Sequence, residues 1–242
     1  MINVKALIIH LDRAVDRLKQ VKQLSQSLPC AAEAIVAVDS VSLADDVVQQ
    51  FYQRKLYRPY YPFRLSKNEI ACFLSHRAAW QKIVDDNLDA GFVLEDDVKL
   101  HDGFLDVFEF SLQHVNQDSF IRFPFRVREQ GKIIAEHGAI KLIKPSQIGL
   151  GQVAQLIGKN AAQHLLDATA HFDRPVDTTM QMYWQTGVHP LVVLPPVVEE
   201  ISRNLGGSTI KKPRGFLSRL YREVARPLYR HKIKVLSQRK DG

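Results

Sequence analysis

Short hydrophobic runs alternate with amphipathic stretches along the first hundred residues. Residues 4–11, 34–38 and 91–95 are apolar runs of the kind that forms buried strands. Between them, hydrophobic positions recur at helical spacing over residues 15–28 and 66–86. Strands that alternate with helices of this length predict βαβ units. We therefore expect an α/β fold with a mainly parallel central sheet flanked by helices.

The second half of the chain has a less regular pattern. Apolar runs at 151–157 and 188–194 predict two further strands, and residues 159–170 and 177–185 have helical character. Residues 119–144 contain shorter strand-like runs. A chain of 242 residues fits one α/β domain with an appendage.

Composition narrows the class of protein. With 45% hydrophobic residues, 24% charged residues and 2 cysteines, the chain is neither a disordered protein nor a disulfide scaffold. It has no apolar run of about 18 residues that could span a membrane. The opening segment lacks the features of a signal peptide, so we expect a cytoplasmic protein with Cys30 and Cys72 reduced.

The basic charge is concentrated at the C-terminus. Residues 211–242 contain 11 Lys and Arg but only two acidic residues, whereas the rest of the chain is close to neutral. Aromatic and aliphatic residues lie between these cations at near-helical spacing, although Pro227 should interrupt the pattern. An amphipathic basic segment suits an anionic membrane surface, and a solvated tail is the alternative. Because the body is nearly neutral, we expect no nucleic-acid partner.

Three consecutive carboxylates, Glu95, Asp96 and Asp97, follow directly on a predicted strand. In open α/β sheets, ligands bind outside the carboxyl ends of the strands. Clustered carboxylates repel one another unless a cation or hydrogen bonds compensate. Alternation along an extended chain would send Glu95 and Asp97 to one side and Asp96 to the other. The carboxylates of Glu95 and Asp97 would suit Mn²⁺ or Mg²⁺ carrying a diphosphate. A solvated acidic loop explains the same residues equally well.

The predicted helix over residues 66–86 carries two polar residues, Glu69 and His76, on its hydrophobic stripe. Such residues must be paired or must face a polar site. Two structural alternatives remain: Glu69 completes a capping box with Ser66, and His76 is a buried core histidine. Ser75 falls off the stripe, which favours a surface position.

Three further residues could act in a site. Asp39 ends the second predicted strand and could bind a ribose hydroxyl or cap the next helix. Asp177 could be a general base, and the alternative is again a helix N-cap. His10 ends the first strand and has no assigned role from its position alone.

Two motifs together resemble glycosyltransferase family 25, which includes bacterial enzymes that extend lipooligosaccharide and lipopolysaccharide cores. They are residues 65–76, LSKNEIACFLSH, and residues 92–98, FVLEDDV. The opening residues 8–13 and the strand end at 37–40 are similar to the same family. The resemblance covers about residues 4–210.

The resemblance implies a GT-A-like fold, a UDP-sugar donor and inversion at the anomeric carbon. It implies that Asp97, with Glu95, holds a divalent metal, Mn²⁺ in first place and Mg²⁺ next. We assign the catalytic roles to Asp97 and, as base, to Asp177. Motif by motif, the donor contacts would come from His10, Asp39, Glu69, Ser75, His76 and Asp96.

The resulting expectation is a catalytic domain at 1–210 followed by a membrane-surface tail at 211–242. The enzyme would transfer a hexose, galactose before glucose, to a lipid-linked lipooligosaccharide or lipopolysaccharide acceptor. It would sit peripherally on the inner face of the cytoplasmic membrane, with its whole active site before residue 210. A non-catalytic nucleotide-sugar-binding protein is the first alternative, and a basic nucleic-acid-binding protein is the second.

Overall fold

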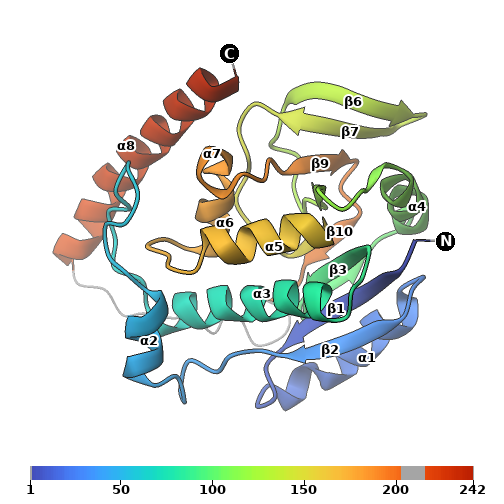
Figure 1. Ribbon diagram of the computed structural model, residues 1–242, viewed down its shortest axis with the longest axis horizontal. Helices are drawn as coiled ribbons and strands as arrows, with labels where there is room; N and C mark the ends of the chain where they lie inside the picture. Colours follow the sequence, from blue (N-terminus) through green and yellow to red (C-terminus); the bar gives the residue numbers. More distant parts are fainter. Residues whose placement is uncertain (1, 203–215, 242) are drawn as a thin grey trace.

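The computed structural model describes residues 2–202 and 216–241 (Figure 1). The strands are β1 (Val4–His10), β2 (Ala32–Val36), β3 (Ala90–Glu95), β4 (Val98–Leu100), β5 (Phe120–Arg122), β6 (Gly131–His137), β7 (Ile140–Pro145), β8 (Ala154–Gly158), β9 (Leu191–Leu194) and β10 (Val198–Glu200). The helices are the short 3₁₀ helix η1 (Val15–Arg17), α1 (Leu18–Ser27), α2 (Asp45–Phe51), α3 (Lys67–Asp85), α4 (Phe104–His114), α5 (Lys159–Ala168), α6 (Val176–Met180), α7 (Tyr183–Thr186) and α8 (Phe216–Asp241).

A central sheet of eight strands has the order β2-β1-β3-β8-β5-β9-β7-β6, and β4 pairs with β10 in a small second sheet. The α/β architecture is therefore confirmed. The pairings of β1 with β2 and β3, and of β5 with β9, are parallel, whereas β8 and β7 run antiparallel to their neighbours. The sheet is mixed as a whole, because β8 runs antiparallel to β3 and β5, and because β7 runs antiparallel to β9 and forms a hairpin with β6.

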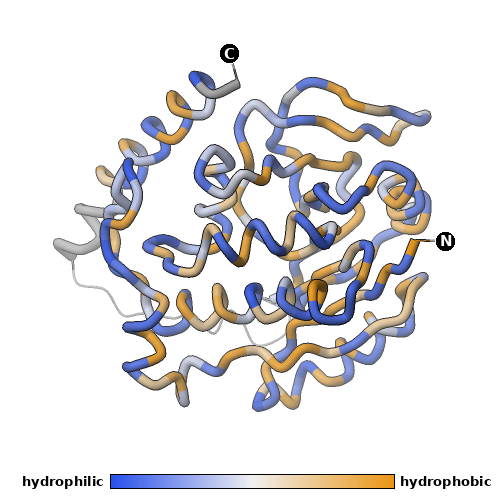
Figure 2. The backbone as a smooth tube through the Cα atoms, in the orientation of Figure 1, coloured by the Kyte–Doolittle hydropathy of each residue, from blue (hydrophilic) through white to orange (hydrophobic). Residues whose placement is uncertain are grey.

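Helices cover both faces of this sheet (Figure 1). Side chains alternate along each strand, so Leu7 and Val93 pack with α3 and α5, while Ile8 and Phe92 pack with α1 and α4. All four side chains are at most 1% exposed. Figure 2 shows the hydrophobic positions concentrated on these central strands. Burial of the two faces in separate cores fixes the register of the sheet, and with it the places where the strands end.

Helix α3 begins at the capping box that the sequence predicts. The backbone N–H of Ser66 donates to the Glu69 carboxylate at 2.7 Å, and the backbone N–H of Glu69 donates to Ser66 Oγ at 3.3 Å. These reciprocal bonds satisfy two of the amide groups that a helix start leaves without partners. Further along the helix, the buried His76 lies next to Glu95, the last residue of β3.

The C-terminal helix α8 packs against the body. Tyr229 and Ile233 are 7% and 1% exposed and form a cluster with Met182 of the segment before α7. Further along, the Tyr183 hydroxyl donates to the carbonyl of the buried Ser237 at 3.0 Å. Figure 1 shows α8 beside the segment that follows α2. One face of this helix is thus part of the folded domain.

Pro227 lies inside α8, which continues across it from 216 to 241, so the expected interruption is wrong. Residues 211–215 and 242 of the predicted tail, and the side chains of 216–222, 240 and 241, lie outside the described part of the structure. Among the described helices, none combines the length and apolarity needed to cross a membrane.

Candidate functional site

Two adjoining cavities open where β1 and β3 end. The smaller cavity, of about 290 Å³, is lined by Arg13, Arg17, Val38, Ser75, His76 and Asp97, among others. The larger cavity, of about 420 Å³, is lined by residues of α6 and α8 and by the segment before β8. Cys72, Glu95 and Glu200 line both cavities. In the sheet, β2 lies on one side of β1 and β3 on the other, so the strand order reverses at β1. Such a switch point is where open α/β sheets bind ligands.

The acidic triplet lies on one cavity, which corrects the expected alternation. Glu95 is the last residue of β3, and the chain turns at Asp96 and Asp97 before β4 begins at Val98. Because the extended conformation ends at Glu95, the period of two no longer applies, and all three acids line the smaller cavity. Glu95 faces the larger cavity as well. Of the three acids in the triplet, Glu95 is therefore the one that lines both cavities.

The carboxylate of Asp96 is paired with neighbouring groups of the protein. Its carboxylate accepts a hydrogen bond from Arg17 Nη1 at 2.5 Å and lies 2.8 Å from Nδ1 of His10. All three side chains are largely buried. His10 is not one of the described residues that line either cavity, so it contacts the site through Asp96. This buried ion pair fixes the turn that presents Asp97.

Asp97 carries a charge that the protein leaves poorly compensated. Burial, and then the nearby charge of Glu95, raise the pKa of Asp97 to about 7, although Arg17 acts in the opposite direction at 3.3 Å. Its Oδ1 atom is buried and has no hydrogen-bond partner among the described residues. A bound cation would complete this environment, so the residues fit the divalent metal that the family resemblance implies.

A second set of possible metal ligands shares Glu95. One ligand atom each from Cys72, His76 and Glu95 lie within 4.8 Å of one another. Burial raises the pKa of the Cys72 thiol well above its ordinary value. A protonated thiol is a poor metal ligand, since metals bind the thiolate. Oxygen donors from Glu95 and Asp97 therefore suit a hard cation better than this mixed set does.

His76 is buried, at 1% exposure, and links α3 to two strands. The Gln155 side-chain amide nitrogen, which also donates to the Gln152 carbonyl, lies 3.3 Å from His76 Nδ1. An amide N–H can only donate, so Nδ1 accepts and Nε2 carries the ring proton. Nε2 is then the donor to Glu95 Oε1 at 3.4 Å. His76 is a positioning residue for Glu95.

Ser75 is buried at 2% exposure, so the expectation of a surface position is wrong. Its hydroxyl donates to the Ala71 carbonyl at 2.8 Å and accepts from the Val38 backbone N–H at 2.9 Å. The segment that follows β2 covers this side of α3, which helical periodicity cannot reveal. Ser75 thereby holds that segment at the wall of the smaller cavity.

Asp39 lies at the margin of the smaller cavity. Its carboxylate accepts from the Val41 backbone N–H at 2.9 Å and from Arg13 Nε at 2.7 Å, and these bonds lower the pKa of Asp39. Helix α2 is capped by Ala44, so the alternative of Asp39 as its N-cap is wrong. Asp39 instead fixes Arg13, which lines the cavity.

Asp177 and Glu69 line the larger cavity. Pro175 is the residue that caps α6, which makes the N-cap alternative for Asp177 wrong. The Asp177 carboxylate accepts from the Gly151 backbone N–H at 3.3 Å and from the Thr178 hydroxyl at 3.2 Å. Glu69 is engaged by the capping box, which leaves Asp177 as the better placed base of the two.

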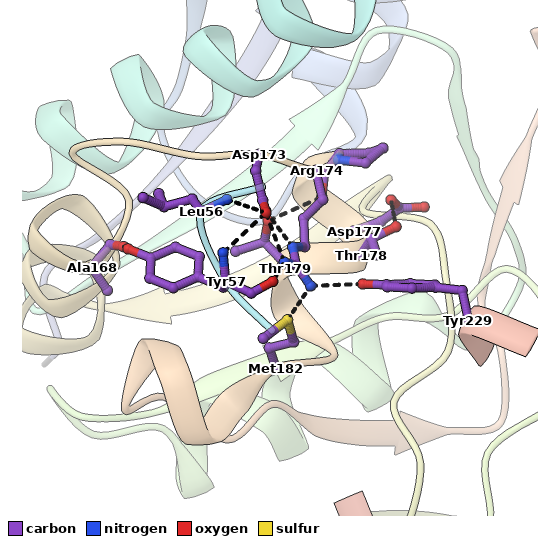
Figure 3. Close-up of polar contacts among 11 residues, drawn as sticks. Leu56, Tyr57, Ala168, Asp173, Arg174, Asp177, Thr178, Thr179, Met182 and Tyr229 are labelled. Carbon is purple, nitrogen blue, oxygen red and sulfur yellow. Dashed lines mark hydrogen bonds and ion pairs between the residues drawn. The ribbon is translucent and has the colours of Figure 1, made fainter. Parts of the chain in front are cut away.

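Helix α8 supplies residues that the sequence analysis missed. Arg226, Tyr229 and Arg230 line the larger cavity, which corrects the expectation that the whole site precedes residue 210. Tyr229 is held by Arg174, whose guanidinium donates to the Tyr229 hydroxyl at 2.7 Å (Figure 3). One feature of the sequence indicates that these residues could act together: Arg226 and Arg230 are four residues apart and therefore lie on one helix face.

Comparison with known proteins identifies the family. The profile of glycosyltransferase family 25 (LPS biosynthesis protein) matches residues 3–180. Procollagen galactosyltransferase 1 of Danio rerio is 33% identical over 98 residues, 39% of this chain and 16% of that protein. Inactive glycosyltransferase 25 family member 3 of Mus musculus is 30% identical over 107 residues, 41% of this chain and 17% of that protein.

Among solved structures, mannose-1-phosphate geranyltransferase from Thermus thermophilus aligns with 89% of this chain and 81% of its own, with 8% identity and a TM-score of 0.36. The chain spans about a sixth of the length of the curated relatives it matches. The family profile covers most of the sequence, including both motifs that surround the cavities. The chain therefore belongs to glycosyltransferase family 25.

Proposed function

We propose that this protein transfers a hexose from a UDP-sugar to a saccharide acceptor of lipooligosaccharide or lipopolysaccharide, with inversion at the anomeric carbon. Galactose is the favoured hexose, with glucose next. The observation that carries the proposal is the pair of adjoining cavities that share Glu95, since group transfer needs donor and acceptor to meet at one point. Membership of the family and the galactosyltransferase name of the zebrafish relative support it.

The donor would occupy the smaller cavity. Glu95 and Asp97 would hold a divalent cation, Mn²⁺ in first place, which when bound neutralises the diphosphate as it leaves. Arg13 and Arg17 line the same cavity and suit phosphate recognition. His76 orients Glu95 and Ser75 secures the segment after β2, so both would act on donor binding through their neighbours.

The acceptor would occupy the larger cavity. Asp177 would take the proton of the acceptor hydroxyl while the hydroxyl oxygen bonds to C1 of the donor sugar, on the face opposite the departing diphosphate. Charge develops at C1 as in other glycosyl transfers. Asp177 accepts only two hydrogen bonds from the described residues, so lone pairs remain for an acceptor hydroxyl.

Asp177→Asn tests the base. We expect kcat to fall by about 10²–10⁴, because an amide cannot take the proton, while the KM for the donor changes little. The variant should stay folded, since Asn can still accept from the Gly151 N–H. Steady-state kinetics with melting curves measure both effects, and Asp102→Asn, at an exposed position, is the matched control. Unchanged kcat would exclude Asp177 as the base.

His76→Ala tests the positioning of Glu95. We expect the Mn²⁺ concentration for half-maximal activity to rise by roughly tenfold or more, because partners that orient metal ligands typically contribute that much. The free energy of unfolding should also fall by ~1–3 kcal/mol, since the buried Gln155 amide loses one of its two acceptors. His164→Ala, on the exposed side of α5, is the control. A loss of stability with unchanged Mn²⁺ dependence would make His76 a core residue only.

A donor screen tests the function as a whole. The full chain is incubated with UDP-galactose, UDP-glucose or other UDP-sugars and a truncated lipooligosaccharide, with Mn²⁺ or EDTA. Metal-dependent extension of the acceptor supports the proposal. Because a mouse relative is named inactive, binding of UDP-galactose without transfer to any acceptor would favour a non-catalytic nucleotide-sugar-binding protein.

We also propose peripheral binding to the anionic inner face of the cytoplasmic membrane through residues 211–242. On α8, Val224 and Leu228 are each 58% exposed and lie among basic residues. Such a face suits a lipid surface that carries the acceptor. Co-sedimentation with anionic vesicles at low and high salt measures the binding, and equal recovery with neutral vesicles would contradict it.

A further inference from the structure

The larger cavity has a cationic wall. Arg226 and Arg230, one turn apart on α8, line it, while Glu95, Asp177 and Glu200 line other parts of the same cavity. A neutral sugar can bind carboxylates and amides through its hydroxyl groups, whereas two guanidinium groups side by side match an anion better than they match hydroxyl groups. The pairing of arginines on one wall with carboxylates on others indicates a ligand that has hydroxyl groups and a negative charge.

The helix that carries these arginines is held in place. Between them in the sequence, Tyr229 is 7% exposed, and its hydroxyl accepts from Arg174 (Figure 3). Burial raises the pKa of Tyr229 to about 12, so the phenol stays neutral. Ile233, one turn further, is 1% exposed. The backbone under both arginines is therefore fixed, which lowers the entropy lost when a ligand binds.

The guanidinium groups are available to a ligand. Arg226 lies over the Phe63 ring, with 5.7 Å between its central carbon and the ring centroid. A guanidinium group over an aromatic face is attracted to the ring, and its N–H groups can still donate to a ligand. Within the described residues, neither Arg226 nor Arg230 forms an ion pair, although four carboxylates line the same cavity, those of Glu69, Glu95, Asp177 and Glu200.

We propose that Arg226 and Arg230 bind a phosphate group on the acceptor saccharide, so that the larger cavity selects a phosphorylated acceptor. This inference rests on the proposed function, because it assigns the larger cavity to the acceptor. Guanidinium groups bind phosphate oxygens bidentately. The donor diphosphate is the competing anion, but the smaller cavity has arginines of its own, Arg13 and Arg17.

The test compares two acceptors that differ in one feature. A phosphorylated core oligosaccharide and the same oligosaccharide after phosphatase treatment are titrated calorimetrically into the full-length chain. The same pair then serves in transfer assays with UDP-galactose and Mn²⁺. The variant is Arg226→Gln/Arg230→Gln. Lys232→Gln/Lys234→Gln is the control, because it removes the same charge from the same helix outside the cavity lining.

We expect the wild type to bind the phosphorylated oligosaccharide more tightly, and the arginine variant to weaken that binding by roughly tenfold or more. Binding of the dephosphorylated oligosaccharide, and the KM for UDP-galactose, should stay unchanged. Equal binding of the two oligosaccharides by wild type, or an equal loss for both in the variant, would overturn the proposal. A raised KM for UDP-galactose would assign the arginines to the donor instead.

Failure of the proposed function gives a different result. Discrimination between the two oligosaccharides that depends on the arginines, but without any transfer, would support the anionic subsite and reject the enzyme. Transfer without discrimination would support the enzyme and reject the subsite.

Discussion

Asp97→Asn should lower transfer by roughly a hundredfold or more, because the variant removes the charge that would hold the metal opposite the leaving diphosphate. The fold should survive. Burial and the neighbouring Glu95 disfavour the ionised form of Asp97, so a neutral amide of the same size relieves repulsion in the absence of metal. Arg17 keeps its bond to Asp96 in the variant.

The measurement combines initial rates over a Mn²⁺ series with melting curves in EDTA. Wild-type protein should gain stability when Mn²⁺ is added, since a ligand that binds only the folded state stabilises it, and the variant should lose this gain. Asp106→Asn, at an exposed position of α4, controls for the loss of one carboxylate. Wild-type turnover by Asp97→Asn in EDTA would reject both the metal and the assignment of Asp97.

Local patterns predicted the elements that surround the site. The capping box at Ser66 placed the start of α3, and the apolar runs placed β1 and β3 to within one or two residues. These features depend on neighbours in sequence and on the burial of the strand, and both can be read from residue order. The position of the carboxylates at a strand end followed directly.

The geometry inside the site could not be predicted in the same way. The turn at Asp96 depends on Arg17 and His10, which are about 80 residues away and contact it only in the folded chain. The burial of Ser75 likewise depends on the segment after β2. Periodicity describes one element at a time, so it cannot show which segment will cover a helix face.

The C-terminal helix is the largest difference between prediction and structure. Its excess of positive charge predicts an appendage outside the site, and an active site that lies wholly before residue 210 would still transfer to a soluble acceptor after deletion of 211–242. Because Arg226, Tyr229 and Arg230 line the larger cavity, we now expect that deletion to impair this transfer. The partner that docks the helix, Arg174, stands in an irregular segment where no local pattern indicated such a role.

Arg174→Met should be the most destabilising single change considered for this protein. Arg174 is 1% exposed and donates to Asp173 at 2.5 Å, to the Tyr57 carbonyl and to the Tyr229 hydroxyl (Figure 3). Its removal leaves the carboxylate of Asp173 buried without its cation, which typically costs about 3–5 kcal/mol. For a chain of this size, the melting temperature should fall by on the order of 10 °C.

A double variant separates the charge from the packing. Asp173→Asn/Arg174→Met removes the unpaired carboxylate and keeps an acceptor for the backbone N–H groups of Leu56 and Tyr57. It should therefore melt higher than Arg174→Met alone, whereas Arg54→Met, at an exposed arginine, should leave melting unchanged. Equal melting of the single and double variants would show that Arg174 acts through packing alone. Wild-type melting of Arg174→Met would show that α8 does not depend on this contact, and the larger cavity would then lose the support proposed for its cationic wall.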